Sequence, residues 1–323
     1  MKAIALFSGG LDSMLAVRLI QEQGLDVVGV CFESPFFSSD KAAQSAHHIG
    51  LSLKVVDITD SLLQIVLNPR HGYGKGLNPC IDCHELMFKT AGEMLKDEKA
   101  DFIISGEVVG QRPMSQNLRS LSTISYGSGY KDLILRPLSA KRLPETLPET
   151  KGWVIRQRLL GLSGRSRQPQ IELAKKFGIE DYPAPAGGCL LTEKVFSRRL
   201  KDLLSLNPSF SRRDIELLKR GRIFRLGDNA KIVVGRNQKE NEVISSLRKE
   251  EDTLFRVDSF PGPTVLATGN LSMEGIELAA AITVSYSDAP TDQSVSVRVT
   301  RGSKDWSILA RKRGKSDFHR FMI

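Results

Sequence analysis

The chain has 323 residues, of which 41% are hydrophobic and 26% charged, and its formal net charge is +9 at pH 7. These proportions are typical of soluble globular proteins and exclude a fibre, a disordered chain and a disulfide-rich scaffold. No apolar stretch of ~20 residues is present, and the first apolar run is too short for a signal peptide, so we expect a cytoplasmic protein without a membrane partner.

The positive charge is unevenly distributed along the chain. Residues 191–323 hold 24 Lys and Arg against 17 Asp and Glu, whereas residues 1–190 are close to neutral. A basic segment favours a polyanionic partner, and RNA is the commonest one.

Strands and helices alternate in the first half of the chain. Apolar runs predict strands at 2–7, 26–32, 52–56, 102–105 and 133–135. Helical periodicity predicts helices at 11–23, 41–48, 60–66, 81–95 and 114–121. Because such alternation forms βαβ units, we expect an α/β fold with a Rossmann-like parallel sheet that binds ligands at the carboxyl ends of its strands.

A second, smaller unit follows. Helices are predicted at 151–160, 168–177, 193–206 and 212–219, and Tyr182–Cys189 is predicted to be a loop because it holds two prolines and two glycines. Beyond residue 222 we expect strands at 231–234, 253–257, 264–267 and 294–299 and helices at 238–249 and 273–284. This pattern predicts a catalytic domain over 1–190, a helical connector over 191–221 and an α+β domain over 222–323.

The strongest local motif is Ser8-Gly9-Gly10-Leu11-Asp12-Ser13, which separates the first strand from the first helix. Glycines let the backbone approach an anion, and the start of the helix supplies unpaired N–H groups. A plain glycine turn with an aspartate helix cap is the alternative.

This SGGxDS motif resembles the PP-loop of ATP pyrophosphatases, which have a HUP-like fold. Those enzymes adenylate a carbonyl oxygen with ATP and release pyrophosphate. The resemblance implies that Ser8, Gly9, Gly10 and Ser13 hold the pyrophosphate moiety. It also implies that Asp12 is catalytic, binding Mg²⁺ or orienting the activated group.

Three of the four cysteines are candidates for chemistry. Cys80 and Cys83 form a CxxC, and Cys189 follows Gly187 and Gly188 on the predicted loop, whereas Cys31 ends an apolar strand and is expected to be buried. The three thiols suit a [4Fe–4S] cluster, a persulfide relay or, with His84, a zinc site. Inert thiols remain a fourth interpretation.

Two motifs add a more specific resemblance. Asn78-Pro79-Cys80 with Cys83, after a PP-loop and before a later Gly-Cys, resembles the tRNA-specific 2-thiouridylases. Gly106–Gln116 is similar to the GExxGQxxSQ segment of tRNA 4-thiouridine synthetases, with one extra residue before Ser115, and Ile134–Leu138 matches their RPL segment. Because the PP-loop begins at residue 8 and no rhodanese-like pattern follows, we expect neither the N-terminal RNA-capturing domain nor the rhodanese-like domain of 4-thiouridine synthetases, and the CxxC is foreign to their usual pattern.

By this resemblance the Gly106–Gln116 segment holds ATP or the target base. Gly106 and Gln111 are the main candidates, with Glu107, Ser115 and Gln116 beside them, and Arg112 is a candidate RNA contact. Solvated polar side chains on a loop are the alternative. Arg136 is predicted either to bind a phosphate or to cover the sheet edge.

The last hundred residues resemble the RNA-associated NFACT-R domain. The similarity lies in VGRNxxxNE from Val234, the DxLFxV…PGP stretch from Asp252, and the AAxxxxYS pattern over Ala280–Ser287. It implies phosphate contacts by Arg236, Lys239, Arg256, Arg298 and Arg301, and by Arg311, Lys312 and Arg313 in the tail. A solvated basic face with a disordered tail is the alternative.

Together these motifs predict an ATP-dependent tRNA sulfurtransferase that makes thiouridine, with 4-thiouridine favoured over 2-thiouridine. Its sulfur would come from sulfide or a cysteine desulfurase, and the oligomeric state stays open, with a homodimer among the options. The alternatives are a PP-loop ligase acting on a small molecule and a non-catalytic RNA-binding translation factor with a relic PP-loop.

Overall fold

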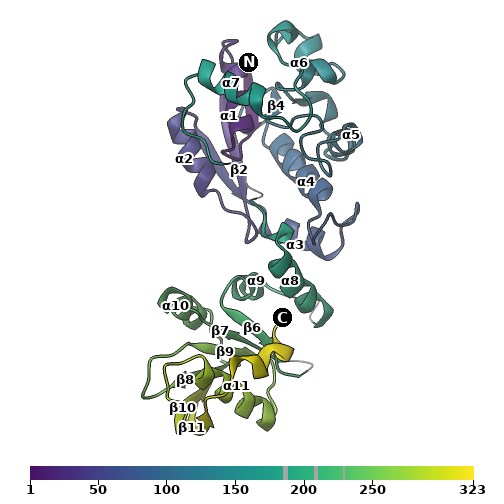
Figure 1. Cartoon of the computed structure of the whole chain (residues 1–323). Helices are drawn as coiled ribbons and strands as arrows, with labels where there is room; N and C mark the ends of the chain where they lie inside the picture. The colour runs from purple at the N-terminus through teal and green to yellow at the C-terminus, as the bar shows by residue number, and fades with distance from the viewer. Residues whose placement is uncertain (185–187, 207–209, 228–229) are drawn as a thin grey trace. The chain divides into compact units, whose positions relative to one another are not determined.

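The computed structural model describes residues 1–184, 188–206, 210–227 and 230–323 (Figure 1). The chain divides into two compact units, Met1–Thr192 and Glu193–Ile323. The predicted loop Tyr182–Cys189 falls in part on residues 185–187, which lie outside the described residues. No helix in the described ranges is long and apolar enough to cross a membrane.

The first unit is built on a five-stranded sheet in the order β3-β2-β1-β4-β5. All neighbouring strands are parallel. The strands are β1 Lys2–Leu6, β2 Asp26–Glu33, β3 Leu53–Asp57, β4 Phe102–Ser105 and β5 Ile134–Leu135. Since parallel strands point the same way, their carboxyl ends and the loops that follow them share one edge of the sheet.

Helices cover both faces of this sheet, because each face buries its own apolar cluster (Figure 1). One cluster joins the sheet to α1 Leu11–Gln21, α2 Asp40–His48 and α7 Gln168–Lys176. The other joins it to α4 Cys80–Glu93 and α5 Leu118–Gly127, and α3 Thr59–Leu67 packs beside α4. The predicted α/β fold is confirmed.

The second unit holds a six-stranded antiparallel sheet in the order β11-β10-β8-β9-β7-β6. Its strands are β6 Arg222–Arg225, β7 Lys231–Val234, β8 Thr253–Val257, β9 Val265–Thr268, β10 Ser294–Arg301 and β11 Lys304–Arg311. Its helices are α8 Lys194–Leu206, α9 Arg212–Leu218, α10 Gln238–Ser246 and α11 Met273–Ser285. The apolar face of the sheet packs against α11, so the predicted smaller α+β domain is also confirmed.

Two predicted helices of the first unit are corrected by the structure. The helix expected at 114–121 begins only at Leu118, because Asn117 accepts the Ser120 N–H and caps it there. The helix expected at 151–160 is replaced by a short α6, Leu147–Thr150, and a 3₁₀ turn at Arg156–Arg158. A capping box starts α6 early, and Gly152, with a φ of +68°, follows its C-cap residue Lys151.

The second unit contains two strands, β6 and β11, that the sequence did not predict. Charged residues at both ends of β11 obscure its alternation of apolar and polar residues, and β11 is a strand because its backbone pairs with that of β10. The tail at residues 311–313, for which disorder was the alternative interpretation, is ordered. Arg311 ends β11, and the Lys312 ammonium donates to the carbonyls of Ser287 and Ala289 over 2.9 and 2.8 Å.

Candidate active site

The loop between β1 and α1 takes its shape from glycine. Gly9 has a φ of +74°, the left-handed region that glycine favours, and a Cβ there would come within 2.7 Å of the Lys41 carbonyl oxygen. The Ser45 hydroxyl of α2 donates to the Gly9 carbonyl over 2.9 Å and holds the loop in place. The first turn of α1 therefore adjoins backbone without side chains, an arrangement that suits a phosphate group.

The two serines of the motif are placed differently. Ser8 is exposed, whereas Ser13 is 6% exposed and its hydroxyl donates to the Gly10 carbonyl over 2.7 Å. Ser8 is thus the solvent-facing serine of the loop, where its hydroxyl accepts the Gly10 N–H over 3.4 Å, and Ser13 stabilises the first turn of α1.

Asp12 belongs to a chain of polar side chains that crosses the site. Its Oδ2 atom accepts a hydrogen bond from the Gln111 amide over 2.7 Å, and the Gln111 carbonyl oxygen accepts one from Gln170 over 3.0 Å. The Asp12 Oδ1 atom is buried and has no hydrogen-bond partner among the described residues. An unpaired carboxylate oxygen of this kind fits a hard divalent cation such as Mg²⁺.

The loops after β1 and β4 touch at Gly106. A Cβ atom at Gly106 would come within 2.5 Å of the Asp12 carbonyl carbon and of the Ser13 nitrogen. Glycine is therefore required for this close approach, and it brings the predicted Gly106–Gln116 segment against the first turn of α1.

Beside this contact lies a buried charge network centred on Glu107, which is 6% exposed. Arg136 donates to its Oε2 atom over 2.8 Å, and the His84 Nδ1 atom lies 2.9 Å from its Oε1 atom. Burial raises the pKa of the Glu107 carboxyl, but Arg136 and His84 outweigh burial and lower that pKa to about 2. Glu107 is therefore a structural anion at neutral pH.

Arg136 is fully committed to this network. It is 6% exposed, donates to the Ser125 hydroxyl over 3.0 Å and lies over the Phe88 ring. A guanidinium enclosed in this way has no free surface for a phosphate. Of the two predictions for Arg136, the structural role therefore fits and phosphate binding does not.

The CxxC lies at the start of α4, where Cys80 is the first residue. The Asn78 amide donates to the Cys80 Sγ atom over 3.1 Å. Asp82, 7% exposed, accepts the backbone N–H groups of Arg70 and His71 over 3.0 and 3.1 Å. The glycine-rich loop before the helix is thereby folded back onto its first turn.

Cys189 lies close to this pair. Burial raises the pKa of the Cys83 thiol, and the neighbouring thiols of Cys189 and Cys80 raise it further. Burial also raises the pKa of Cys31 to about 11, so the fourth thiol stays protonated and inert. The structure therefore gathers the three predicted cysteines and leaves Cys31 in the core.

The arrangement of these thiols bears on the metal they would hold. In the described ranges, no group of three or more His, Cys, Asp or Glu is placed to bind a single ion. The His84 Nδ1 atom bonds to Glu107, a contact of the kind that metal-ligating histidines make through their other ring nitrogen, so it is compatible with the Cys₃His zinc interpretation. The three thiols would supply three of the four cysteine ligands that iron–sulfur clusters commonly have.

The side chains predicted to contact RNA differ in whether they already have a hydrogen-bond or ion-pair partner within the protein. Arg236 is paired with Glu240 and Arg298 with Asp258, whereas Arg256 donates to the Ser245 hydroxyl and Arg301 to the Asn270 side chain. Lys239 and Arg112 are exposed. Hydrogen bonding to Glu240 raises the pKa of the Arg236 guanidinium, and the ion pair with Glu240 partly offsets its charge.

Sequence reasoning missed Gln170 and Arg248. Gln170 is 1% exposed on α7 and lies four residues before the equally buried Ala174. A polar residue on the buried stripe of an amphipathic helix is the signal that marks it. Arg248 follows α10 and lines a basic hollow on the second unit, and no motif in the sequence singles it out.

A parallel sheet whose first strand runs into an SGGxDS loop is the arrangement expected of a PP-loop domain. Residues 1–142 match the family model described as Thiamine biosynthesis protein (ThiI). Residues 221–322 match the model described as NFACT protein RNA binding domain. Both predicted resemblances are confirmed for these segments.

Individual relatives agree with the first match. The chain is 25% identical to a tRNA-specific 2-thiouridylase MnmA of Pelobacter propionicus, with 44% of this chain and 43% of that protein aligned. It is 29% identical to a probable tRNA sulfurtransferase of Staphylococcus saprophyticus, with 42% and 34% aligned. The chain thus spans less than half the length of these curated relatives.

A likeness to a solved structure is weaker. A 4-thiouridine synthetase–RNA complex with bound ATP shares 22% identity and a TM-score of 0.35, covering 55% of this chain and 51% of that chain.

Proposed function

We propose that this chain is an ATP-dependent tRNA sulfurtransferase that adenylates a uridine carbonyl oxygen and replaces it with sulfur. Residues 1–190 would form the catalytic domain, 191–221 a helical connector and 222–323 the RNA-binding domain. The match of residues 1–142 to the ThiI model supports 4-thiouridine over 2-thiouridine as the product.

One observation carries this proposal: the cysteine helix is tied to the phosphate loop. His84, next to Cys83, bonds to Glu107, and the preceding Gly106 lies against Asp12 and Ser13. A group that activates a substrate with ATP and a group that delivers sulfur must act on the same carbonyl group, the first on its oxygen and the second on its carbon. The short connection through Glu107 supports the proposal that the two belong to one site.

The first step is the activation of the uridine. A carbonyl oxygen is a poor leaving group, and transfer of AMP to it turns it into a good one. The loop from Ser8 to Gly10 and the start of α1 would hold the pyrophosphate that departs, with Ser13 shaping that turn. Asp12 would bind Mg²⁺, which neutralises phosphate charge when present, while Gly106 and Gln111 shape the nucleotide site.

The second step is the displacement of AMP by sulfur. Cys80, Cys83 and Cys189 would hold a [4Fe–4S] cluster with one open iron position, which supplies sulfide when the cluster is loaded. The alternative is a persulfide on one cysteine, with a second thiol releasing the product and closing a disulfide. Sulfide or a cysteine desulfurase would supply the sulfur for the cluster route, and a cysteine desulfurase, which hands over sulfur as a persulfide, would supply it for the persulfide route.

Nucleoside mass spectrometry tests the proposal. Unmodified tRNA is incubated anaerobically with cluster-reconstituted protein, Mg-ATP and sulfide, and we expect a thiouridine peak that requires ATP and coelutes with 4-thiouridine. A peak only with a cysteine desulfurase and iron-free protein supports the persulfide route. No peak in either case refutes the proposal and favours a small-molecule ligase or a non-catalytic RNA-binding factor.

A matched pair of variants ties the reaction to the cysteines. Cys189→Ala should abolish thiolation, whereas Cys31→Ala, which alters only the buried strand thiol, should leave the ATP-dependent peak in place. Full thiolation by the Cys189 variant would remove that cysteine from the mechanism.

A further inference from the structure

The solvent face of the second sheet places two arginines directly opposite each other. In the antiparallel pairing of β8 with β10, Arg256 faces Arg298 and Leu254 faces Thr300. The alternate residues on these strands, including Phe255 and Val299, are fully buried against α11. Arg256 and Arg298 therefore project from the open face of the sheet.

Like charges in directly opposed cross-strand positions repel, so such a pair is stabilised by a negative group between or beside them. Asp258 supplies one such group, since its Oδ1 atom lies 3.1 Å from the Arg298 Nε atom. Arg256 donates only to the Ser245 hydroxyl, over 2.8 Å. Among the described residues, neither Arg256 nor Arg248 forms an ion pair with a carboxylate.

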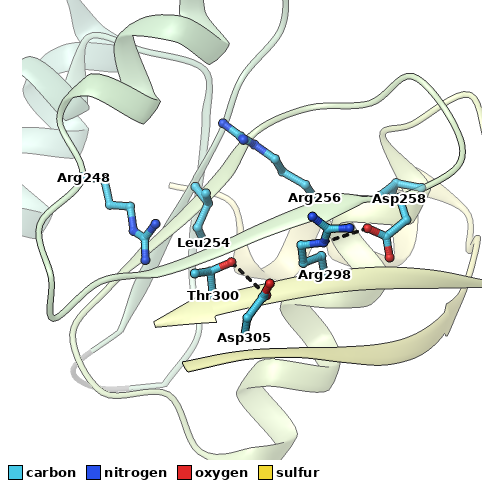
Figure 2. Close-up of a pocket in the computed structure, with 8 residues that line it drawn as sticks. Arg248, Leu254, Arg256, Asp258, Arg298, Thr300 and Asp305 are labelled. Carbon is cyan, nitrogen blue, oxygen red and sulfur yellow. Dashed lines mark hydrogen bonds and ion pairs between the residues drawn. The ribbon is translucent and has the colours of Figure 1, made fainter. Parts of the chain in front are cut away.

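These side chains surround a hollow of about 370 Å³. Figure 2 shows Arg248 on one side of it, with Arg256, Arg298 and Asp258 along the strands and Thr300 bonded to Asp305. The hollow thus presents two guanidinium groups without a carboxylate partner. The third guanidinium, of Arg298, is paired with Asp258, and a phosphate can replace that carboxylate.

We propose that this hollow, lined by Arg248, Arg256 and Arg298, is where the second unit binds backbone phosphates of RNA. The inference rests on the RNA-binding role given above and names its site. Guanidinium groups bind phosphate through two parallel hydrogen bonds, and the Arg298–Asp258 bond can exchange for an Arg298–phosphate bond. The match of this unit to an RNA-binding model favours RNA over an acidic protein as the partner.

Phosphate contacts are measured by the salt dependence of binding. Fluorescence anisotropy with a labelled tRNA transcript and the full chain would be recorded over a series of salt concentrations. Arg248→Gln and Arg256→Gln should each lower affinity several-fold and reduce the log–log salt slope by about 1. Arg320→Gln is the matched control, because Arg320 is an exposed arginine of the same unit that lies over Phe321.

A third variant, at Asp258, should change tRNA affinity in the opposite direction. Asp258→Asn removes a competing carboxylate and frees Arg298, so tRNA affinity should rise and the salt slope should steepen. A purely structural role for these side chains would give unchanged slopes in all three variants, provided that their thermal unfolding is unaltered. Slopes that are unchanged, or reduced as much in the Arg320 control, would overturn the proposal.

The thiolation assay separates this proposal from the previous one. Under the inference, Arg248→Gln and Arg256→Gln raise KM for tRNA and leave kcat unchanged. If the unaltered chain makes no thiouridine, the proposed reaction fails while the salt slopes still decide whether the hollow binds RNA phosphates. A fall in kcat with unchanged KM would contradict the assignment of the hollow.

Discussion

At the scale of single residues, Gln170 shows how a side chain far along the sequence can control the site. Its amide donates to the Gln111 carbonyl oxygen, which forces the Gln111 amide nitrogen toward Asp12. Without Gln170, Gln111 could turn over and present its oxygen to the Asp12 carboxylate. Gln170 is therefore a positioning residue for the carboxylate that we assign to Mg²⁺.

We expect Gln170→Leu to weaken ATP-dependent turnover roughly ten-fold, because it removes one buried hydrogen bond and leaves its partner unsatisfied. Single-turnover thiolation with varied Mg²⁺ would show the loss as a weaker apparent affinity for the metal. Glu172→Gln, an exposed substitution on the same helix, is the control and should behave like the unaltered protein. Equal effects of both variants would mean that α7 acts only through stability.

Arg136 makes the second prediction at this scale. Arg136→Met leaves the buried Glu107 carboxylate without its guanidinium partner, a change that costs about 3–5 kcal/mol of unfolding free energy. Urea unfolding followed by circular dichroism would measure it. Lys89→Met, which removes an exposed partner of Glu93, should cost less than about 1 kcal/mol.

The pH dependence gives an independent readout. The pKa of Glu107 is lowered in the folded protein to about 2, from an ordinary value of 4.5. Its contribution to stability is thus complete above the ordinary pKa and is lost as the pH falls toward 2. In Arg136→Met the folded pKa rises, so this contribution shrinks at neutral pH. Adding Glu107→Gln should recover part of the stability, and a double variant less stable than Arg136→Met would contradict the ion-pair account.

At the scale of elements, the turn into α1 depends on one glycine more than on its neighbour. Gly9→Ala places a Cβ against the Lys41 carbonyl at a positive φ, whereas a Cβ at Gly10 meets only the Ser8 hydroxyl at 3.5 Å. Thermal unfolding without nucleotide should show Gly9→Ala destabilised by about 1–3 kcal/mol and Gly10→Ala nearly unchanged. Similar melting of the two variants would mean that the loop adapts.

The elements also show what the sequence could and could not predict. The strands of the parallel sheet and the SGGxDS turn follow from local apolar runs and glycines, and the structure has them within one or two residues. The Glu107 network and the Gln170 contact depend on side chains brought together from distant parts of the chain, which no local pattern encodes. The same reason explains the missed β11, whose pairing is supplied by β10.

At the scale of the whole molecule, ATP chemistry and RNA binding are assigned to separate compact units. The first unit ends at Thr192. Arg199 of α8 donates to the carbonyls of Leu218 and Gly221, so α8 is held by the second unit. A chain ending at Thr192 should keep its ATP affinity and lose tRNA affinity by about 100-fold or more, since most phosphate contacts are removed. Filter binding with both ligands measures this, and unchanged tRNA affinity would place RNA recognition in the first unit.

The linked side chains of His84, Glu107 and Arg136 have a consequence for evolution. A lineage that loses one of the three leaves a hydrogen-bonding group in or beside the buried Glu107–Arg136 pair without its partner, so single changes are penalised and joint changes are tolerated. Positions 84, 107 and 136, on three separate elements, should therefore vary together when homologous sequences are compared.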